Sequence, residues 1–324
     1  MELSRRRFLG STAAGALALP SLGAAPAAAG LPTRPLGKTG LTVPILGFGS
    51  GSRFLMYKDE DRALEALNRA IDLGITYIDT AHSYGDGKSE ERVGKVMATR
   101  RGEVTLATKL SARTAEAARR QLELSLKRLK TDRLDVVHIH ALSGPDDLAK
   151  IEAPDGVLKA LYRARDEKIV RAIGITSHAS PEALRDALER HDFDCTQMAL
   201  NAARARMADA PGGMKATPMK QGGFEELALP VAARKGMGVI AMKVFGQEQL
   251  LGAAPVDRLI AYALSLPVSL ASLGMPKPEF IERNAAIARA FTPMSAEERG
   301  KLSDSIAAEK KVALAEFFRD HADA

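Results

Sequence analysis

The sequence of 324 residues contains no tryptophan, and aromatic residues make up only 5% of it. A surface that stacks nucleic-acid bases depends on exposed aromatic side chains, so the composition argues against such a surface. The formal net charge is +6, of which Arg5, Arg6 and Arg7 together with Glu2 contribute +2, leaving about +4. That excess is too small to favour a nucleic acid, and no nucleic-acid partner is expected.

Cysteine is nearly absent as well, because Cys195 is the only one in the chain. No disulfide can form within the chain, so folding does not depend on an oxidising compartment. Hydrophobic residues make up 46% and charged residues 27%, which is typical of a folded chain with a sizeable core. The length allows one large domain or two ordinary ones.

Residues 1–30 have the layout of a secretory signal peptide. They begin with Ser-Arg-Arg-Arg-Phe-Leu at 4–9, continue with a weakly apolar stretch at 10–22, and end in small residues at 24–30 that suit a signal peptidase. The Ser-Arg-Arg-x-Phe-Leu order closely resembles the twin-arginine export signal. It predicts export by the twin-arginine machinery after folding, and a periplasmic location. The alternative is a disordered basic terminus.

The apolar stretch at 10–22 is short and rich in Gly and Ala. It is therefore a poor candidate for a membrane span, and no stable span is expected after cleavage of the signal.

Strand-like apolar runs alternate with helical patterns in the remaining residues, 31–324. The strand-like runs are 45–49, 75–79, 104–109, 134–140, 170–175, 194–200, 238–243 and 267–273. The helical patterns are 59–74, 90–98, 115–129, 156–167, 181–190, 224–235, 256–264 and 278–290. Eight such units predict a single α/β domain with the (β/α)₈ TIM-barrel fold. A doubly wound open sheet is the structural alternative.

Three further segments lie outside this alternation. Residues 33–44 read as an N-terminal β-hairpin with a Gly-Lys-Thr-Gly turn. Near the end of the chain, Ser295 and Glu298 form a capping-box pattern before an extra C-terminal helix that runs to roughly residue 310. The segment 202–223 is rich in Gly, Pro and Met, and we expect a long mobile loop there on the catalytic face.

Ionisable side chains stand at the ends of three successive strand-like runs. Asp79 ends the second run, Lys109 the third and His140 the fourth. Catalytic groups in a barrel come from the carboxyl ends of its strands, and neighbouring strands lie about 5 Å apart. We therefore expect these side chains to converge, with Tyr84 folding over them. His82 lies in the same stretch and is left as a mouth-lining residue without an assigned role.

These four groups suit proton transfer to a carbonyl oxygen. The phenol of Tyr84 has an ordinary pKa near 10 and is a poor acid at neutral pH, but a nearby ammonium group lowers that pKa. Lys109 would supply the ammonium group, Asp79 would hold it charged, and His140 would orient the substrate oxygen. Taken singly, each residue also has a purely structural explanation. Their conjunction favours the functional interpretation.

The segments 79–85, 107–109 and 135–140 closely resemble the motifs of the aldo-keto reductase superfamily. The likeness extends from about residue 37 to residue 284. It implies a barrel that binds an extended nicotinamide dinucleotide without a Rossmann domain. It also implies hydride transfer between NAD(P)H and a small aldehyde or ketone, with Tyr84 as general acid and Asp79, Lys109 and His140 in the roles given above.

The resemblance also implies a set of cofactor-binding residues. They are Thr176, Ser177, Gln197, Met242, Lys243, Gly274 and Asn284. The two positions that often carry a lysine and an arginine for the 2′-phosphate are Gly274 and Phe280 here, with Lys277 or Arg283 as possible replacements. The resemblance to this superfamily favours NADP(H) as the cofactor, with NAD(H) as the alternative.

Two other functions fit parts of the sequence. His138 and His140 lie on one face of a strand, as the ligands of a metal-dependent barrel hydrolase would. A non-catalytic NAD(P)-binding sensor or partner subunit is the second alternative. We expect no metal, because the hydrolase hypothesis leaves Tyr84 and Gln197 unexplained.

Overall fold

The computed structural model describes residues 30–210, 213–218 and 222–306. The export signal predicted for residues 1–30 lies, apart from Gly30, outside the described residues, and so does the end of the predicted tail helix. In the described residues no helix is both long and apolar enough to cross a membrane.

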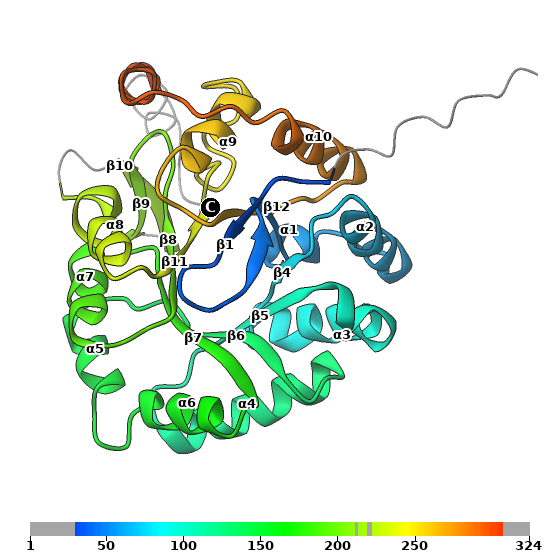
Figure 1. Cartoon of the computed structure of the whole chain (residues 1–324), viewed down its shortest axis with the longest axis vertical. Helices are drawn as coiled ribbons and strands as arrows, with labels where there is room; N and C mark the ends of the chain where they lie inside the picture. The colour runs from blue at the N-terminus through cyan, green and yellow to red at the C-terminus, as the bar shows by residue number, and fades with distance from the viewer. Residues whose placement is uncertain (1–29, 211–212, 219–221, 307–324) are drawn as a thin grey trace, which may run out of the picture.

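Eight parallel strands close into a barrel in the order β11-β12-β3-β4-β5-β6-β7-β8 (Figure 1). The predicted (β/α)₈ barrel is confirmed, and closure rules out the open sheet. The strands are β3 (Leu46–Gly49), β4 (Tyr77–Asp79), β5 (Thr105–Leu110), β6 (Leu134–Ile139), β7 (Val170–Ser177), β8 (Cys195–Ala199), β11 (Gly238–Met242) and β12 (Leu270–Gly274).

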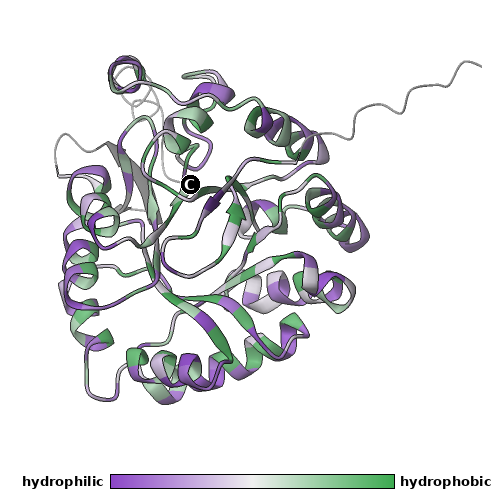
Figure 2. Cartoon of the chain, in the orientation of Figure 1, coloured by the Kyte–Doolittle hydropathy of each residue, from purple (hydrophilic) through white to green (hydrophobic). Residues whose placement is uncertain are grey.

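Helices surround the barrel and turn their apolar faces toward the strands, as the colours of Figure 2 show. Polar side chains fix where several helices begin: Asp59, Thr114 and Ser180 each accept a hydrogen bond from a backbone N–H of the first turn. The helices are α1 (Ser52–Leu55), α2 (Glu60–Asp72), η1 (Tyr84–Gly87), α3 (Lys88–Arg100), η2 (Arg101–Glu103), α4 (Ala115–Leu129), α5 (Pro145–Ile151), α6 (Val157–Asp166), α7 (Pro181–Arg190), α8 (Phe224–Arg234), α9 (Val256–Leu264) and α10 (Pro278–Arg289).

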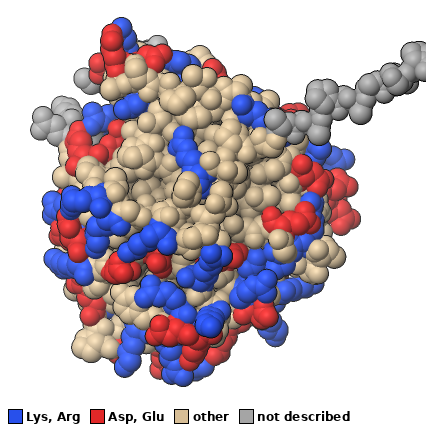
Figure 3. Space-filling view, in the orientation of Figure 1, with Lys and Arg blue, Asp and Glu red and all other residues tan. Residues whose placement is uncertain are grey.

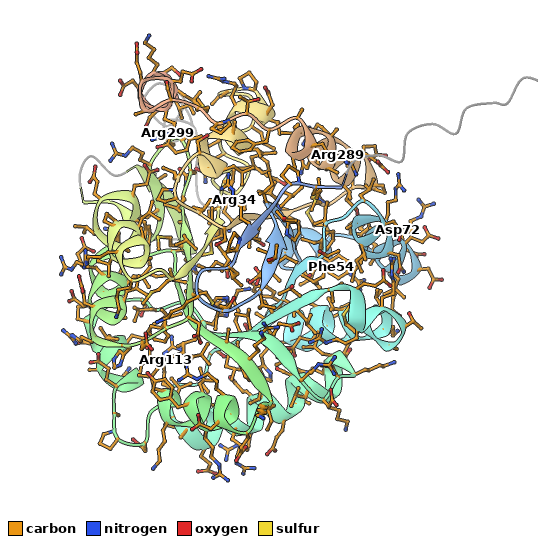
Figure 4. All side chains as sticks on the ribbon, in the orientation of Figure 1. Arg34, Phe54, Asp72, Arg113, Arg289 and Arg299 are labelled. Atoms are coloured by element: carbon orange, nitrogen blue, oxygen red, sulfur yellow. The ribbon has the colours of Figure 1, made fainter. Side chains whose placement is uncertain are left out.

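The predicted N-terminal hairpin is confirmed, and it covers the amino-terminal end of the barrel. Strand β1 (Thr33–Pro35) pairs antiparallel with β2 (Thr42–Pro44). Leu36 in its turn is fully buried, and a Cβ atom on Gly238 would lie only 2.7 Å from it. Arg34, labelled in Figure 4, donates to the carbonyl oxygen of Val268 at 2.7 Å. Charged side chains of both signs ring this end in Figure 3, around a largely uncharged centre.

The segment 202–223, for which we expected a long mobile loop on the catalytic face, contains two strands. Strand β9 (Ala205–Ala210) pairs antiparallel with β10 (Gly213–Pro218) and forms a hairpin. The Asn201 side chain donates to the carbonyl oxygen of Ala205 at 2.9 Å and accepts from its N–H at 3.0 Å, which fixes the start of the hairpin.

The capping box of the tail is confirmed. The N–H of Ser295 donates to Glu298 at 2.7 Å, and the N–H of Glu298 donates to the Ser295 hydroxyl at 3.1 Å. Residues 296–306 are helical in the described part of the chain.

Candidate active site

A buried ion pair stands at the carboxyl end of the barrel. The Lys109 ammonium group lies 2.6 Å from Asp79 Oδ1 and also donates to the carbonyl oxygen of Thr80 at 2.8 Å. The second oxygen of Asp79 accepts from Gln197 at 2.9 Å and from Ser272 at 3.3 Å. Both carboxylate oxygens of Asp79 are thus hydrogen-bonded, so burial of the carboxylate leaves neither oxygen without a partner.

The charge of Lys109 is set by two opposing effects. Burial by itself lowers the pKa of the ammonium group, but the adjacent Asp79 and Tyr84 outweigh it, so the pKa of Lys109 is raised above its ordinary value. The lysine therefore stays charged at neutral pH.

Tyr84 lies at the start of η1 and reaches over this pair, as predicted. Its hydroxyl oxygen is 3.4 Å from the Lys109 nitrogen, and its ring centre is 5.6 Å from that of His140 in an edge-on arrangement. On the other side the ring lies against Gly51, where a Cβ atom would come within 3.3 Å of it. Asp79, Tyr84, Lys109 and His140 therefore come together.

The pKa of Tyr84 corrects one expectation. Burial raises the pKa of the phenol, the charge of Lys109 lowers this pKa, and the charge of Asp79 raises it. The net result is a pKa of Tyr84 above its ordinary value. Lys109 lowers the pKa of Tyr84 as expected, but the effect of burial is larger, so the net pKa is not lowered. The phenol is therefore protonated at neutral pH and available as a proton donor.

His140 is a neutral imidazole beside this phenol. Burial, followed by the charge of Lys109 and the neighbouring His178, holds the pKa of His140 well below its ordinary value. Its backbone is fixed by Arg113, which donates to the His140 carbonyl oxygen at 2.8 Å and pairs with Asp147 at 2.7 Å. A neutral ring held in this way can hydrogen-bond to a substrate oxygen.

His138 lies deeper, inside the barrel. It is fully buried, and a Cβ atom on Gly174 would lie 2.4 Å from its Nδ1 atom. Neither ring nitrogen has a hydrogen-bond partner among the described residues. Throughout the described chain there is no group of three or more His, Cys, Asp or Glu residues that could hold a metal ion. The hydrolase hypothesis therefore has no ligand cluster to rest on here.

A cavity of about 440 Å³ opens beside the ion pair. It runs from Asp79 and Tyr84 past the ends of β3, β11 and β12 to the first turns of α10. Five of the residues predicted to bind a cofactor line it: Gln197, Met242, Lys243, Gly274 and Asn284.

Thr176 and Ser177 lie outside the lining of this cavity. The Thr176 hydroxyl accepts from the N–H of Ala141 at 2.8 Å, and the Ser177 hydroxyl donates to the carbonyl oxygen of Leu142 at 2.7 Å. Both hydroxyl groups thus hold the loop after His140. Their role in cofactor binding stays a prediction.

Two cationic residues of the lining, Arg53 and Lys243, differ in their partners, and Arg53 is not among the cofactor-binding residues predicted from the sequence. Arg53 packs over Gly274 and pairs with Glu248 at 2.9 Å, which joins α1 to the segment after β11. Lys243 has a φ angle of +58°, and its ammonium group has no hydrogen-bond or ion-pair partner among the described residues. Burial, followed by the charges of Lys109 and Arg53, lowers the pKa of Lys243 to about 8.

The expectation that His82 lines the mouth is wrong. His82 does not line the cavity; its Nδ1 atom lies 3.3 Å from the Ser125 hydroxyl, behind the loop. Among residues 54–57, only Leu55 lines the cavity, whereas Phe54 packs edge-on against Phe48 in the core.

Known proteins resemble this chain in sequence. A family model described as "Aldo/keto reductase family" matches residues 45–258. Aldo-keto reductase YhdN of Bacillus subtilis is 39% identical over 154 residues, which is 43% of this chain and 45% of that protein. The match thus spans less than half of that relative. D-threo-aldose 1-dehydrogenase of a Pseudomonas species is 28% identical over 250 residues, 67% of this chain and 70% of that protein.

Solved structures resemble it as well. An aldo-keto reductase from Pseudomonas aeruginosa is 28% identical, with a TM-score of 0.64, over 80% of this chain and 95% of that one. An aldo-keto reductase from Klebsiella pneumoniae, solved in complex with NADPH, is 24% identical, with a TM-score of 0.65, over 82% of this chain and 92% of that one. At 24% identity, the likeness to the Klebsiella pneumoniae structure shows a shared fold alone.

We expect the variant His138→Gln to lose less stability in acid than the wild type. Burial lowers the pKa of His138 to about 3 in the folded protein, whereas an unfolded histidine titrates near 6.5. Between those pH values the unfolded chain binds one more proton here, so the free energy of unfolding falls as the pH falls, by up to about 1.4 kcal/mol per pH unit. Urea unfolding at pH values of about 7, 6 and 5 measures this slope. Equal slopes for both proteins would contradict the prediction.

Proposed function

The chain belongs to the aldo/keto reductase family, and on that premise we propose that it transfers a hydride between NAD(P)H and an aldehyde or ketone, with Tyr84 as the general acid. The observation that carries the proposal is the Tyr84 hydroxyl 3.4 Å from Lys109, which is itself paired with Asp79. A phenol held protonated beside a fixed ammonium group suits proton donation to a carbonyl oxygen.

In this mechanism the side chains of the protein carry out the proton transfer. The nicotinamide, when bound, supplies the hydride. Tyr84 donates its phenolic proton to the carbonyl oxygen of the substrate, and the ammonium group of Lys109 stabilises the phenolate that is left. Asp79 keeps Lys109 charged and in place. The neutral ring of His140 hydrogen-bonds to the same carbonyl oxygen and orients it.

The residues that line the cavity fit a nicotinamide dinucleotide. Gln197 uses its amide nitrogen for Asp79, while its Oε1 atom is buried and has no partner among the described residues. A carboxamide N–H of the nicotinamide could donate to that oxygen. Farther along, Arg53, Lys243 and Arg283 offer positive charge to phosphate groups.

We propose NADP(H) as the preferred form. Arg283 lines the cavity, and its guanidinium carbon lies 4.6 Å from the ring centre of Phe280. Lys277, the other candidate for the 2′-phosphate, is exposed and outside the lining. The Klebsiella pneumoniae relative was solved with NADPH, which is consistent with this choice.

Replacing the general acid tests the mechanism. Tyr84→Phe should reduce the rate of carbonyl reduction by about 10²- to 10⁴-fold, because it removes only the proton donor. The affinity for NADPH, measured by quenching of its fluorescence, should stay within about twofold of the wild-type value. Unchanged turnover would refute the role of Tyr84. If the wild type bound NADPH but reduced no aldehyde or ketone in a broad panel, the non-catalytic sensor would be the better interpretation.

The cofactor preference has its own test. Arg283→Ala should weaken NADPH binding by about tenfold or more, because a charge-assisted contact to the 2′-phosphate is lost. Binding of NADH, which lacks that phosphate, should change by less than about twofold. Lys277→Ala is the matched control and should leave both affinities near their wild-type values. An equal loss for both cofactors would assign Arg283 to another part of the ligand.

We also propose that the chain is exported through the twin-arginine machinery to the periplasm, on the strength of the Ser-Arg-Arg-x-Phe-Leu order at 4–9. Replacing Arg5 and Arg6 by lysine should retain the protein in the cytoplasm. Cell fractionation with immunoblotting checks this outcome, and an unchanged distribution would count against the proposal.

A further inference from the structure

The loop that carries Tyr84 has an unusual backbone. Three successive residues have positive φ angles: Gly85 at 57°, Asp86 at 54° and Gly87 at 97°. Asp86 is not a glycine, so it is strained in this region. A run of this kind persists only where the surrounding structure holds it in place, and the position of Tyr84 depends on it.

Arg128 of α4 holds this loop on both sides of Tyr84. Its Nη1 atom donates to the carbonyl oxygen of His82 at 3.1 Å, and its Nη2 atom donates to that of Asp86 at 3.1 Å. The guanidinium group lies against Gly87, where a Cβ atom would come within 2.1 Å of its Cζ atom. One planar side chain therefore spans the strained turn, with a separate nitrogen for each of the two carbonyl oxygens.

Arg128 is itself tied to the strand that carries Lys109. Its Nη1 atom lies 3.4 Å from Oε2 of Glu90, a carboxylate that is fully buried in α3. The other oxygen of Glu90 accepts from the hydroxyl of Thr108, the residue before Lys109, at 2.7 Å. Helices α3 and α4 pack against each other, which brings these groups together (Figure 1).

The ring of His82 belongs to the same cluster. Its Nδ1 atom lies 3.4 Å from the Arg128 guanidinium group and 4.0 Å from Glu90. This histidine thus faces the helices behind the loop, which explains why it does not line the cavity. The loop is anchored by its backbone and by one of its own side chains.

We propose that Arg128 is a positioning residue for the reaction: it fixes the loop 82–87 so that the hydroxyl group of Tyr84 stays within reach of Lys109. The inference rests on the proposed function, in which Tyr84 is the acid. Arg128 does not line the cavity, so it acts only through Tyr84. Its loss displaces the proton donor without removing it.

Arg101 of η2 provides a matched control. Like Arg128, it donates to two backbone carbonyl groups, those of Val104 and Arg133, and it pairs with one carboxylate, that of Asp135. Its side chain is 15% exposed and that of Arg128 is 17% exposed. It lies at the opposite end of the barrel, before β5 and β6. Arg101→Met and Arg128→Met therefore remove similar bonds, but only the second lies behind Tyr84.

Hydrogen exchange tests the clamp without reference to activity. The N–H groups of His82, Tyr84 and Asp86 donate to carbonyl oxygens at 3.0 to 3.3 Å. In Arg128→Met, amide exchange in a peptide covering 82–88 should become about tenfold faster or more, whereas Arg101→Met should leave that peptide unchanged. Wild-type exchange of this peptide in Arg128→Met would overturn the inference.

Kinetics test whether the clamp matters for the chemistry. Arg128→Met should lower kcat about ten- to hundredfold, because small misplacements of a reacting group have effects of that size, while NADPH affinity stays unchanged. Arg101→Met should keep the wild-type kcat. Arg128→Lys should recover only part of the loss, because one nitrogen replaces the two that donate to separate carbonyl oxygens; full recovery would overturn the need for the forked side chain.

The two proposals can fail separately. If Tyr84→Phe abolishes reduction while Arg128→Met keeps the wild-type kcat, the role of Arg128 is refuted and the proposed function stands. If Tyr84→Phe keeps full activity, the proposed function fails, and the role of Arg128 in catalysis fails with it, whatever hydrogen exchange shows.

Discussion

The contact between Lys109 and Asp79 is the constraint on which the rest of the site depends. Two opposite charges at a barrel mouth are stable there only if every remaining hydrogen-bonding position is filled. Asp79 meets this condition through Gln197 of β8, on the opposite wall of the barrel, and through Ser272 of β12, two strands away. Closure of the barrel brings Gln197 to the carboxylate, because its strand β8 lies opposite β4.

Tyr84 differs from the other members of the site because it lies on a loop. Strand ends place Asp79 and Lys109 through regular backbone pairing, whereas a tyrosine on a turn with positive φ angles needs a separate support. The contacts of Arg128 to the carbonyl groups of His82 and Asp86 provide it. The position of Tyr84 therefore depends on helix α4 as well as on the barrel.

The sequence predicted the parts of the site that follow from periodicity. Asp79, Lys109 and His140 converge because the barrel brings the ends of neighbouring strands together. Contacts between distant segments could not be predicted in this way: Gln197 reaches Asp79 across 118 residues of sequence. The direction in which the pKa of Tyr84 shifts could not be predicted from the sequence either, because it depends on burial, which only the packed structure shows. The orientation of His82 depends likewise on how α3 and α4 pack.

The two ends of the barrel differ in composition: one is packed with apolar side chains, and the other carries the candidate active site. The amino-terminal end is closed by apolar packing around Leu36, and it contains none of the proposed catalytic groups. The unfavourable features gather at the other end: a buried ion pair, a strained turn and a partly buried Lys243 without a partner among the described residues. A ligand that supplies negative charge and hydrogen-bond donors would offset the cost at Lys243 and that of the unpaired oxygen of Gln197. The site is thus less stable alone than with its ligand bound, as expected where polar groups are arranged in advance for binding.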